Sequence, residues 1–414
     1  MIRILICGNT LGTWSGLGYE ASRMLKGFIK SGKFDVRYAI TCGQEIQNAG
    51  CYGEDMHKIM EGLKYYNMQI DRPDTCKNFD AIYQDFHPQI IFAVHDAWTI
   101  ESIISSPYRN SFMLCLYATI ETPEYPETIF YPTHYNQSIR KSLKKMFRSC
   151  DVVIPVTQMG KDALKKLDIE SEDFIYNGID FDKRCKKINQ KEIVFSGNVK
   201  NDDFLFMAVG ENNIRKRMDL VLEAFALFLK KVEKPEKYKL YLHTNLDHAY
   251  EGTDLKTMIK VLGISDNTVI MTVPWISTEM LYDRYSVSDA FITLSGGEGF
   301  NLPVVEAMMH RKPVIYCDYG GHGEFLKDIG YPVRVKNYYN APHGYIKWAM
   351  ADIEDAVQQM LFISTRPDIK DRLDKGFKFA QSVDWTMIFP KIYKIIFNKF
   401  KEFEFPPVEL KRMF

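Results

Sequence analysis

Short apolar runs alternate with amphipathic segments along most of the 414-residue chain. A continuous run such as Ile2 to Cys7 is typical of a parallel strand that is buried on both faces. Further strands are expected at 34–41, 88–95, 112–120, 151–156, 204–209, 239–243, 268–273, 289–294 and 312–317. Between them, helical periodicity predicts helices at 19–31, 138–148, 218–231, 255–262 and 384–400. The chain is therefore expected to have an α/β fold.

The strand–helix alternation occurs twice, on either side of a charged and weakly patterned stretch at 181–201. We interpret this stretch as a linker between two doubly wound, Rossmann-like domains. The length agrees, because 414 residues are too many for one ordinary core. We place the first domain at 1–185 and the second at 190–384.

The amino-acid composition restricts the classes of protein to which this chain can belong. Apolar residues make up 46% and charged residues 26% of the chain, which is typical of a soluble globular protein. Lys plus Arg and Asp plus Glu are both 53, so no overall field favours nucleic acid and any anion site must be local. The first residues are broken by glycine too early for a signal peptide, and no apolar segment approaches the roughly 20 residues of a membrane span. We expect a cytoplasmic protein.

Eight cysteines lie scattered along the chain, without a C-x-x-C pair and without zinc-ligand spacing. Several of them lie in apolar runs. This pattern favours buried free thiols in a reducing compartment.

The stretch richest in chemical signals is Ser295 to Glu306, which reads Ser-Gly-Gly-Glu-Gly-Phe-Asn-Leu-Pro-Val-Val-Glu. It joins an expected strand to a helix start, and such a turn leaves backbone N–H groups free to hold an anion. Its two carboxylates, Glu298 and Glu306, suit the recognition of hydroxyl groups. The stretch therefore predicts a site for a ligand with phosphate and hydroxyl groups. A structural role, with Glu306 as an ordinary charge on a helix face, is the alternative.

Cationic and acidic residues also follow other expected strands. Arg215-Lys216-Arg217 follows strand 204–209 and precedes a helix, where basic residues oppose the positive end of the helix dipole. A role in binding a diphosphate explains them better than a surface helix does. His95, Asp96 and Glu121 follow two strands of the first domain, so we expect them at a common sheet edge.

A glycine loop after the first strand contains Gly16-Leu-Gly-Tyr-Glu-Ala21, a formal match to the dinucleotide fingerprint. We discount a dehydrogenase that binds NAD, because about eight residues separate this motif from its strand. Strand 34–41 also does not end in the acidic residue that would hold a ribose. Contact between the loop and a phosphate remains plausible.

The predicted helix at 138–148 has basic residues along one face, among them Lys144 and Arg148. An ordinary solvated face is one interpretation. Peripheral contact with an anionic membrane surface or a lipid-phosphate acceptor is the other.

Four separated segments, in the same order, resemble the retaining glycosyltransferases of family 4, especially the mannosyltransferases. They lie at 15–18, 177–180, 210–217 and 298–306. The resemblance implies the GT-B fold, in which two Rossmann-like domains face a cleft and the second domain holds most of the nucleotide. It also implies that a C-terminal helix within 385–414 crosses back to the first domain. Such enzymes need no metal ion or other cofactor.

The resemblance assigns a role to each candidate site residue. Glu298 and the amides of Gly299, Phe300, Asn301 and Leu302 would hold the donor sugar, Glu306 the ribose, Lys216 with Arg215 the diphosphate, and Gly210 and Gly16 would lie against the phosphates. Glu121 would contact the sugar or the acceptor. There are two departures from the family: Glu211 stands where an Arg is usual, and strand 112–120 does not end in the usual His.

We therefore expect transfer of a hexose from a nucleotide sugar to a hydroxyl of a glycan or lipid, with retention of configuration. GDP-mannose is the first choice of donor, and UDP-glucose or UDP-N-acetylglucosamine the next. A nucleotide-sugar epimerase and a non-catalytic sugar-nucleotide binder of the same fold remain alternatives. The aromatic C-terminal tail, 397–414, could form a homodimer contact or pack on its own domain.

Overall fold

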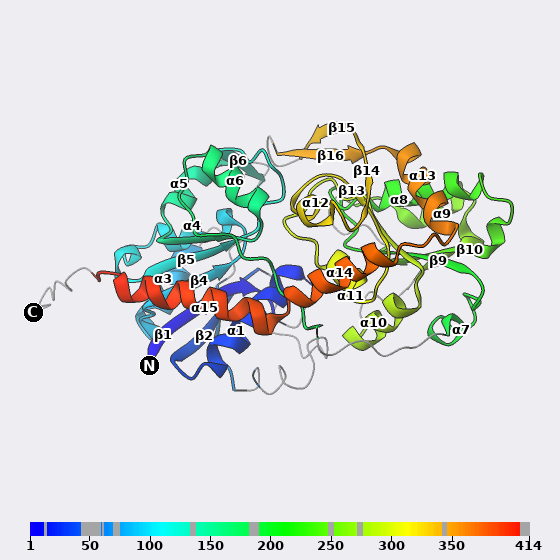
Figure 1. Cartoon of the computed structure of the whole chain (residues 1–414). Coiled ribbons are helices and arrows are strands. Elements are labelled where there is room, and N and C mark those ends of the chain that lie inside the picture. The colour runs from blue at the N-terminus through cyan, green and yellow to red at the C-terminus, as the bar shows by residue number, and fades with distance from the viewer. Residues whose placement is uncertain are drawn as a thin grey trace, which may run out of the picture.

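The computed structural model describes residues 1–11, 15–42, 59, 62–68, 75–132, 138–181, 190–246, 252–270, 276–341 and 346–405. Two parallel six-stranded sheets, each covered by helices, lie side by side along the long axis of the molecule (Figure 1). The two-sheet α/β architecture expected from the alternation of strands and helices is confirmed.

The first sheet has the strand order β3-β2-β1-β4-β5-β8. Its strands are β1 (Ile2–Asn9), β2 (Phe34–Cys42), β3 (Tyr65–Asn67), β4 (Ile90–Val94), β5 (Met113–Ala118) and β8 (Val152–Pro155). Every residue of β4, β5 and β8 is buried, because helices cover both faces of the sheet.

The second sheet has the order β11-β10-β9-β12-β13-β14. Its strands are β9 (Phe204–Val209), β10 (Tyr238–His243), β11 (Thr268–Ile270), β12 (Ala290–Thr293), β13 (Val314–Cys317) and β14 (Tyr331–Val333). In chain order both sheets read 3-2-1-4-5-6, the doubly wound arrangement. The strand order reverses between β1 and β4 in one sheet and between β9 and β12 in the other, and ligands bind at such points, beyond the carboxyl ends of the strands.

Helices connect these strands and cover the sheets. They are α1 (Gly16–Lys30), α3 (Thr75–Phe86), α4 (Glu101–Ile104), α5 (Leu143–Arg148), α6 (Gln158–Lys166), α7 (Lys191–Val194), α8 (Met218–Leu229), α9 (Leu255–Val261), α10 (Thr278–Val287), α11 (Leu302–Met309), α12 (Gly321–Leu326), α13 (Ile353–Ser364), α14 (Lys370–Ser382) and α15 (Trp385–Glu402). Short 3-10 turns occur at Ala97–Ile100, Arg109–Ser111, Pro235–Lys237 and Ser265–Asn267. Two antiparallel hairpins complete the described structure: β6 (Thr128–Pro132) with β7 (Ser138–Ser142), and β15 (Val335–Asn340) with β16 (Lys347–Ala351).

The helix predicted at 138–148 is wrong in its first half. Residues 138–142 form β7, which pairs with β6, and the helix begins only at Leu143. The Ser142 side chain accepts a hydrogen bond from the Lys145 N–H at 3.2 Å and so caps the helix start. In the remaining helix, Lys144 Nζ pairs with Glu127 at 3.4 Å and with Asp168 at 3.2 Å. Part of the predicted basic face is therefore neutralised by neighbouring acids.

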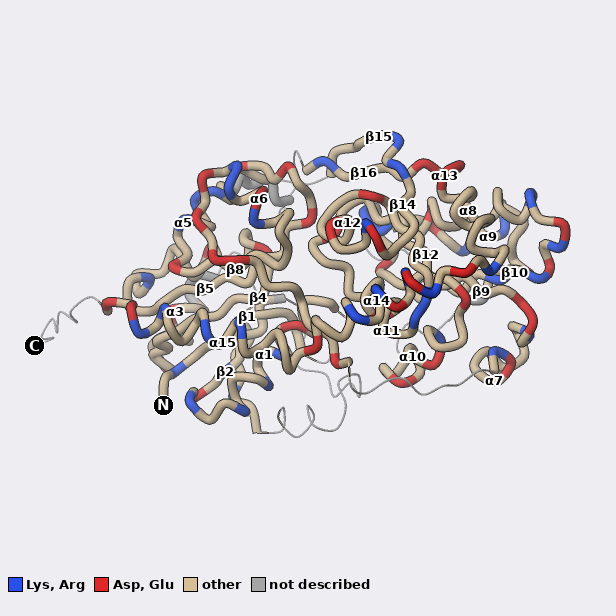
Figure 2. Tube along the Cα trace, in the orientation of Figure 1, with Lys and Arg blue, Asp and Glu red and all other residues tan. Residues whose placement is uncertain are grey.

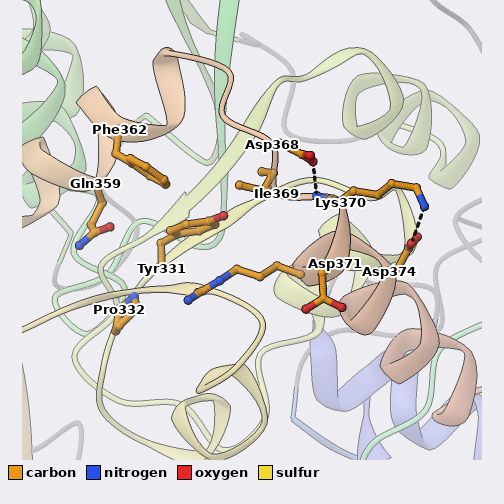
Figure 3. Close-up of a pocket in the computed structure, with 10 residues that line it drawn as sticks. Tyr331, Pro332, Gln359, Phe362, Asp368, Ile369, Lys370, Asp371 and Asp374 are labelled. Atoms are coloured by element: carbon orange, nitrogen blue, oxygen red, sulfur yellow. Dashed lines mark hydrogen bonds and ion pairs between the residues drawn. The ribbon is translucent and has the colours of Figure 1, made fainter.

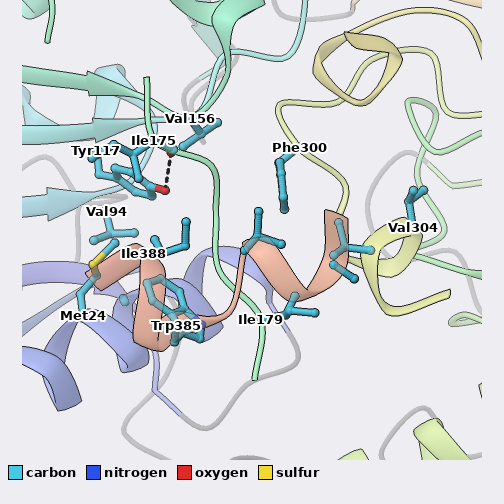
Figure 4. Packing of buried hydrophobic residues seen from close by; sticks show 14 of the residues in the cluster. Met24, Val94, Tyr117, Val156, Ile175, Ile179, Phe300, Val304, Trp385 and Ile388 are labelled. Carbon is cyan, nitrogen blue, oxygen red and sulfur yellow. Dashed lines mark hydrogen bonds between the residues drawn. The ribbon is translucent and has the colours of Figure 1, made fainter. Parts of the chain in front are cut away.

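One hydrophobic cluster extends from the first sheet into the second (Figure 4). Trp385 and Ile388 of α15 pack in this cluster, which also contains Phe300 of the second half. The α15 helix, red in Figure 1, lies along α1, where the Phe389 ring is so close to Gly27 that a Cβ there would meet it at 2.4 Å. The C-terminal helix therefore packs on the first sheet, although its chain neighbour α14 packs on α11.

The structure also bears on the expectations about surface charge, membrane spans, cysteines and the C-terminal tail. Charges of both signs are interspersed over both halves (Figure 2). In the part of the chain that the structure describes, no helix combines the length and the apolar character needed to cross a bilayer. Cys7, Cys115 and Cys317 are buried free thiols, as the sequence predicts. In the C-terminal tail, Phe403 packs against the chain's own core, and residues 406–414 lie outside the described structure.

Candidate functional site

The loops after β9 and β12 carry the residues with the strongest chemical signals. These two strands are neighbours and flank the point where the order of the second sheet reverses. Arg215 and Lys216 lie on the loop after β9, and Glu298 lies on the loop after β12. The topology therefore brings together residues that are about 80 positions apart in sequence.

Glu298 is the centre of this cluster. Its side chain is 5% exposed, and its two carboxylate oxygens are each bound by a cation: Lys216 Nζ lies 2.6 Å from Oε1, and Arg215 Nη1 lies 3.0 Å from Oε2. Burial alone would raise the pKa of Glu298, but these two cations more than offset it and lower the pKa to about 2. Glu298 is therefore ionised at any physiological pH.

Arg215 also joins the two halves of the molecule. Its Nη2 lies 3.2 Å from Oε1 of Glu121, which follows β5 of the first sheet. Its Nη1 donates a hydrogen bond to the Gly297 carbonyl at 2.6 Å. Burial would lower the pKa of Arg215, but Glu121 and Glu298 raise it above its ordinary value. One guanidinium thus bridges carboxylates from opposite sheets.

The first sheet contributes two carboxyl groups with raised pKa values. Asp96 follows β4, and burial together with the charge of Glu121 raises its pKa to about 8. Burial also raises the pKa of Glu121, although Arg215 opposes the shift. Because β4 and β5 are neighbouring parallel strands, Asp96 and Glu121 lie at the expected common edge of the sheet. His95 lies beside them, with its Nδ1 accepting the Asp96 N–H at 2.8 Å, and burial lowers its pKa to about 4.

Glycines allow the backbones of this site to approach closely. A Cβ on Gly299 would lie 2.3 Å from Cγ2 of Thr119, across the interface between the halves. A Cβ on Gly210 would lie 2.9 Å from Met218 Cε. Gly16, the first residue of α1, is more open, since its Cβ would meet only Leu302 Cδ1, at 3.7 Å. The starts of α1 and α11 therefore face each other.

Two residues between the carboxylates of the Glu298–Glu306 stretch have contrasting environments. The Phe300 ring packs 5.5 Å from Tyr176 and 5.2 Å from Phe325, so the ring belongs to the core and only its backbone is left for a ligand. Asn301 has a φ of +75° and is 7% exposed, and its side-chain Nδ2 is buried without a hydrogen-bond partner. An unpartnered buried amide beside a candidate ligand site is an available donor.

Glu306 lies apart from the cations, on α11. Its partners are two tyrosines of α10: Tyr285 Oη donates to it at 3.0 Å and Tyr282 Oη at 3.4 Å. Burial raises the pKa of Glu306 to about 7, although both hydrogen bonds act in the opposite direction. Glu298 and Glu306 thus have the same side chain but pKa values shifted in opposite directions.

Glu211, which stands where the family usually has an Arg, lies outside the cluster around Glu298. Glu211 is exposed and lies 3.5 Å from the Asn213 amide, not among the ion pairs of Glu298. Arg215 takes the place beside Glu298.

Two neighbouring residues were missed by sequence reasoning. His322 of α12 is fully buried near Glu298, with Nε2 3.0 Å from the Cys317 carbonyl; burial lowers its pKa, although Glu298 acts to raise it. Glu324 accepts the backbone N–H groups of Gln158 and Met159 at 3.1 and 2.8 Å, and so holds α12 to the start of α6. The Gly-Gly-His-Gly-Glu run after strand 312–317 was the available signal.

A separate pocket of about 940 Å³ lies on the outer surface of the second half, between β14, α13 and the start of α14 (Figure 3). Tyr331 and Phe362 provide its aromatic walls, and Lys370 and Asp374 pair at its rim. No predicted site residue lines it. It is therefore distinct from the Glu298 cluster.

Two doubly wound sheets with a charged site between them form the GT-B fold. Residues 189–358, which include both carboxylates and the cation loop, match the family described as glycosyl transferases group 1. The family match and the fold together support a glycosyltransferase.

Known proteins similar to this chain agree with that class. The uncharacterized glycosyltransferase 335 of Sulfolobus islandicus rod-shaped virus 1 is 24% identical over 253 residues, which are 56% of this chain and 68% of that protein. Sucrose-phosphate synthase from Thermosynechococcus elongatus has a TM-score of 0.70 at 14% identity, with 97% of this chain and 100% of that chain covered. HepE of Anabaena in complex with UDP-glucose has a TM-score of 0.68 at 13% identity, with 96% and 100% covered.

The pKa of Glu306 predicts a pH-dependent stability. The pKa of Glu306 is 4.5 in the unfolded chain and about 7 in the folded chain. Between these two pH values the folded chain keeps a proton that the unfolded chain has lost. The contribution of Glu306 to stability is therefore complete below about pH 4.5 and is lost as the pH rises to about 7. Glu306→Gln cannot ionise, so it should gain stability relative to the wild type across this window, by at most about 1.4 kcal/mol per pH unit.

Urea unfolding at several pH values measures this difference. The exposed Glu236→Gln serves as the control, and its difference from the wild type should not change with pH in the same way. A constant difference between Glu306→Gln and the wild type from pH 4.5 to 8 would rule out the raised pKa.

Proposed function

We propose that the protein is a retaining, metal-independent glycosyltransferase that moves a hexose from a nucleotide sugar to a hydroxyl of a glycan or lipid acceptor. The observation that carries this proposal is the buried cluster in which Lys216 and Arg215 bind Glu298. It lies where the strand order of the second sheet reverses, between β9 and β12. This cluster combines cations for a diphosphate with a carboxylate for sugar hydroxyls.

The cations are the groups suited to the leaving nucleoside diphosphate. Breaking the glycosidic bond to the phosphate places new negative charge on the departing oxygen, and preorganised positive groups stabilise that charge. Lys216 and Arg215 are held in place by Glu298 and Glu121 before any ligand arrives. A bound diphosphate would share these cations with the carboxylates.

The remaining residues surround the donor in this proposal. Glu298, the amides of 299–301 and the unpartnered amide of Asn301 hold the sugar hydroxyls. Glu306, with Tyr282 and Tyr285, holds the ribose. Gly210 and Gly16 allow the phosphates to approach the starts of α8 and α1.

The acceptor enters from the first sheet, where Glu121 and Asp96 face Arg215. Asp96 has a pKa of about 8, so it is largely protonated at neutral pH and can donate a hydrogen bond. For retention, the acceptor oxygen attacks the anomeric carbon from the face that the diphosphate leaves. The departing phosphate oxygen takes the acceptor's proton, so the protein supplies position and charge stabilisation.

GDP-mannose remains the first choice of donor because of the family 4 resemblance. The UDP-glucose bound to HepE, whose fold is similar, supports a uridine nucleotide as the alternative. Peripheral contact with a membrane and a homodimer stay predictions, as does a cytoplasmic location.

Calorimetric titration of GDP-mannose, UDP-glucose and UDP-N-acetylglucosamine tests the donor. Glu306→Ala should weaken the preferred donor by about 1–3 kcal/mol, the cost of leaving a buried hydrogen-bonding group without its partner. Glu279→Ala is a matched control, because Glu279 is exposed on the helix that carries Tyr282 and Tyr285. Equal donor affinity in the Glu306 and Glu279 variants would remove Glu306 from the ribose site.

The metal-independent, retaining reaction is tested with the donor so identified. The initial rate should be unchanged by excess EDTA, because cationic side chains stabilise the leaving group, and the product should keep the donor's anomeric configuration by NMR. An EDTA-inactivated enzyme that Mg²⁺ or Mn²⁺ restores, or an inverted product, would contradict the mechanism. Free sugar released by an epimerase, or donor binding without turnover, would favour the alternatives of the same fold.

A further inference from the structure

The β15–β16 hairpin links the site to both halves of the molecule. It follows β14 in the chain, and its strands pair with Tyr338 opposite Ala349 and Tyr339 opposite Trp348. Figure 1 shows it at the top of the second half. Trp348 and Tyr339 nevertheless pack in a hydrophobic cluster of the first sheet. The hairpin therefore bridges the two halves next to the Glu298 cluster.

The β15 strand holds the loop that carries the cations. Tyr339 Oη donates a hydrogen bond to the Ile214 carbonyl at 2.9 Å, directly before Arg215. The Tyr339 ring itself is held between Trp348, 5.9 Å away, and the guanidinium of Arg217, 5.4 Å from its centre. Ile214 is 38% exposed, so the packing of its side chain fixes the loop only in part. Its carbonyl is the anchored group.

The β16 strand holds the loop that carries Glu298. The Ala349 N–H donates to the Gly296 carbonyl at 2.7 Å, and the Gly296 N–H donates to the Arg215 carbonyl at 2.7 Å. A Cβ on Gly296 would lie 2.6 Å from the Ala349 carbonyl oxygen and 3.0 Å from Tyr339 Oη, so the loop lies directly against the hairpin. A series of hydrogen bonds thus connects Tyr339 of β15 to the cation loop, the cation loop to Gly296, and Gly296 to Ala349 of β16. We call this series the circuit, because β15 and β16 are themselves paired.

The hairpin also contacts the acceptor side of the site. A Cβ on Gly297 would lie 3.1 Å from Trp348 Cδ1 and 3.2 Å from the Glu121 carbonyl oxygen. Lys347 Nζ pairs with Glu124 at 3.2 Å. The loops of Glu298, of the cations and of Glu121 therefore all lie against this one hairpin.

We propose that Tyr339 is a positioning residue for sugar transfer: its hydroxyl fixes the Ile214 carbonyl and thereby places Arg215 and Lys216 against Glu298 and the donor's diphosphate. This inference rests on the proposed function. A guanidinium that must meet Glu121, Gly297 and Glu298 at once requires a backbone placed to within a fraction of an ångström. Tyr339 acts through the backbone and does not itself touch the reacting atoms.

Tyr339→Phe tests this role, because it removes the hydroxyl and keeps the ring between Trp348 and Arg217. Tyr338→Phe is the matched control: Tyr338 is the preceding residue of the same strand, is 57% exposed and packs on Tyr319. Loss of one hydrogen bond predicts roughly five- to tenfold weaker donor binding and a similar fall in kcat/KM for the donor. The KM for the acceptor should match that of Tyr338→Phe, and the free energy of unfolding should fall only by about the 1 kcal/mol that one hydrogen bond contributes.

Hydrogen–deuterium exchange on the ligand-free protein gives a readout that does not depend on the donor. The Gly296 N–H donates to the Arg215 carbonyl, and the Lys216 N–H donates to Asn213 within the cation loop. Both amides should exchange at least about fivefold faster in Tyr339→Phe than in Tyr338→Phe, because the cation loop loses its anchor at the Ile214 carbonyl. Equal exchange at both amides, or a donor affinity within twofold of the control, overturns the inference. If the wild type binds no nucleotide sugar, the proposed function fails, and the exchange rates still decide whether Tyr339 places the loop.

Discussion

The structure depends on one buried carboxylate that two cations bind at once. A charge at 5% exposure is costly unless it is paired and hydrogen-bonded, so Glu298 requires both Lys216 and Arg215. The pair joins the loops after two neighbouring strands into one rigid unit. Arg215 then extends this unit to Glu121 of the other half, so that the same guanidinium contacts carboxylates from both sheets.

Glycines make this arrangement possible at the level of the backbone. A Cβ on Gly321 would lie 2.1 Å from the Gly299 carbonyl oxygen, and Gly320 has a φ of +85° beside the backbone of Glu298. The glycine-rich runs after β12 and β13 are therefore required by close packing of two turns against each other. The same packing leaves Glu298 in a water-poor environment, where electrostatic interactions with a ligand are strong.

Much of the fold could be predicted from local patterns. Strand 204–209 was placed at its observed bounds, because a fully buried strand appears as a continuous apolar run. The helix start at Leu143 was missed, because cross-strand pairing of 138–142 with β6 overrides helical periodicity. The β15–β16 hairpin was also missed, although the aromatic pair Tyr338-Tyr339 and the single Trp348 flank a stretch with Pro and Gly.

Part of the candidate site could be predicted from the order of strands along the chain. Residues that follow strands of a doubly wound sheet gather at one edge, so Glu298, Lys216 and Glu121 could be grouped from sequence. The tyrosines that bind Glu306 lie on a helix that no motif marks, and their hydrogen bonds form only through tertiary packing. The opposite pKa shifts of the two glutamates depend on such neighbours and could not be predicted from the residue type.

The central claim is that the cations bound to Glu298 serve a nucleoside diphosphate. The most direct measurement is the calorimetric affinity of GDP and UDP for Lys216→Ala, with Lys231→Ala, a lysine whose Nζ pairs with Glu354 at 2.9 Å, as the control. The account predicts that the preferred nucleotide binds at least about tenfold more weakly to Lys216→Ala, the loss of a charged hydrogen bond, and unchanged to Lys231→Ala. Equal affinity of both variants for both nucleotides would contradict it.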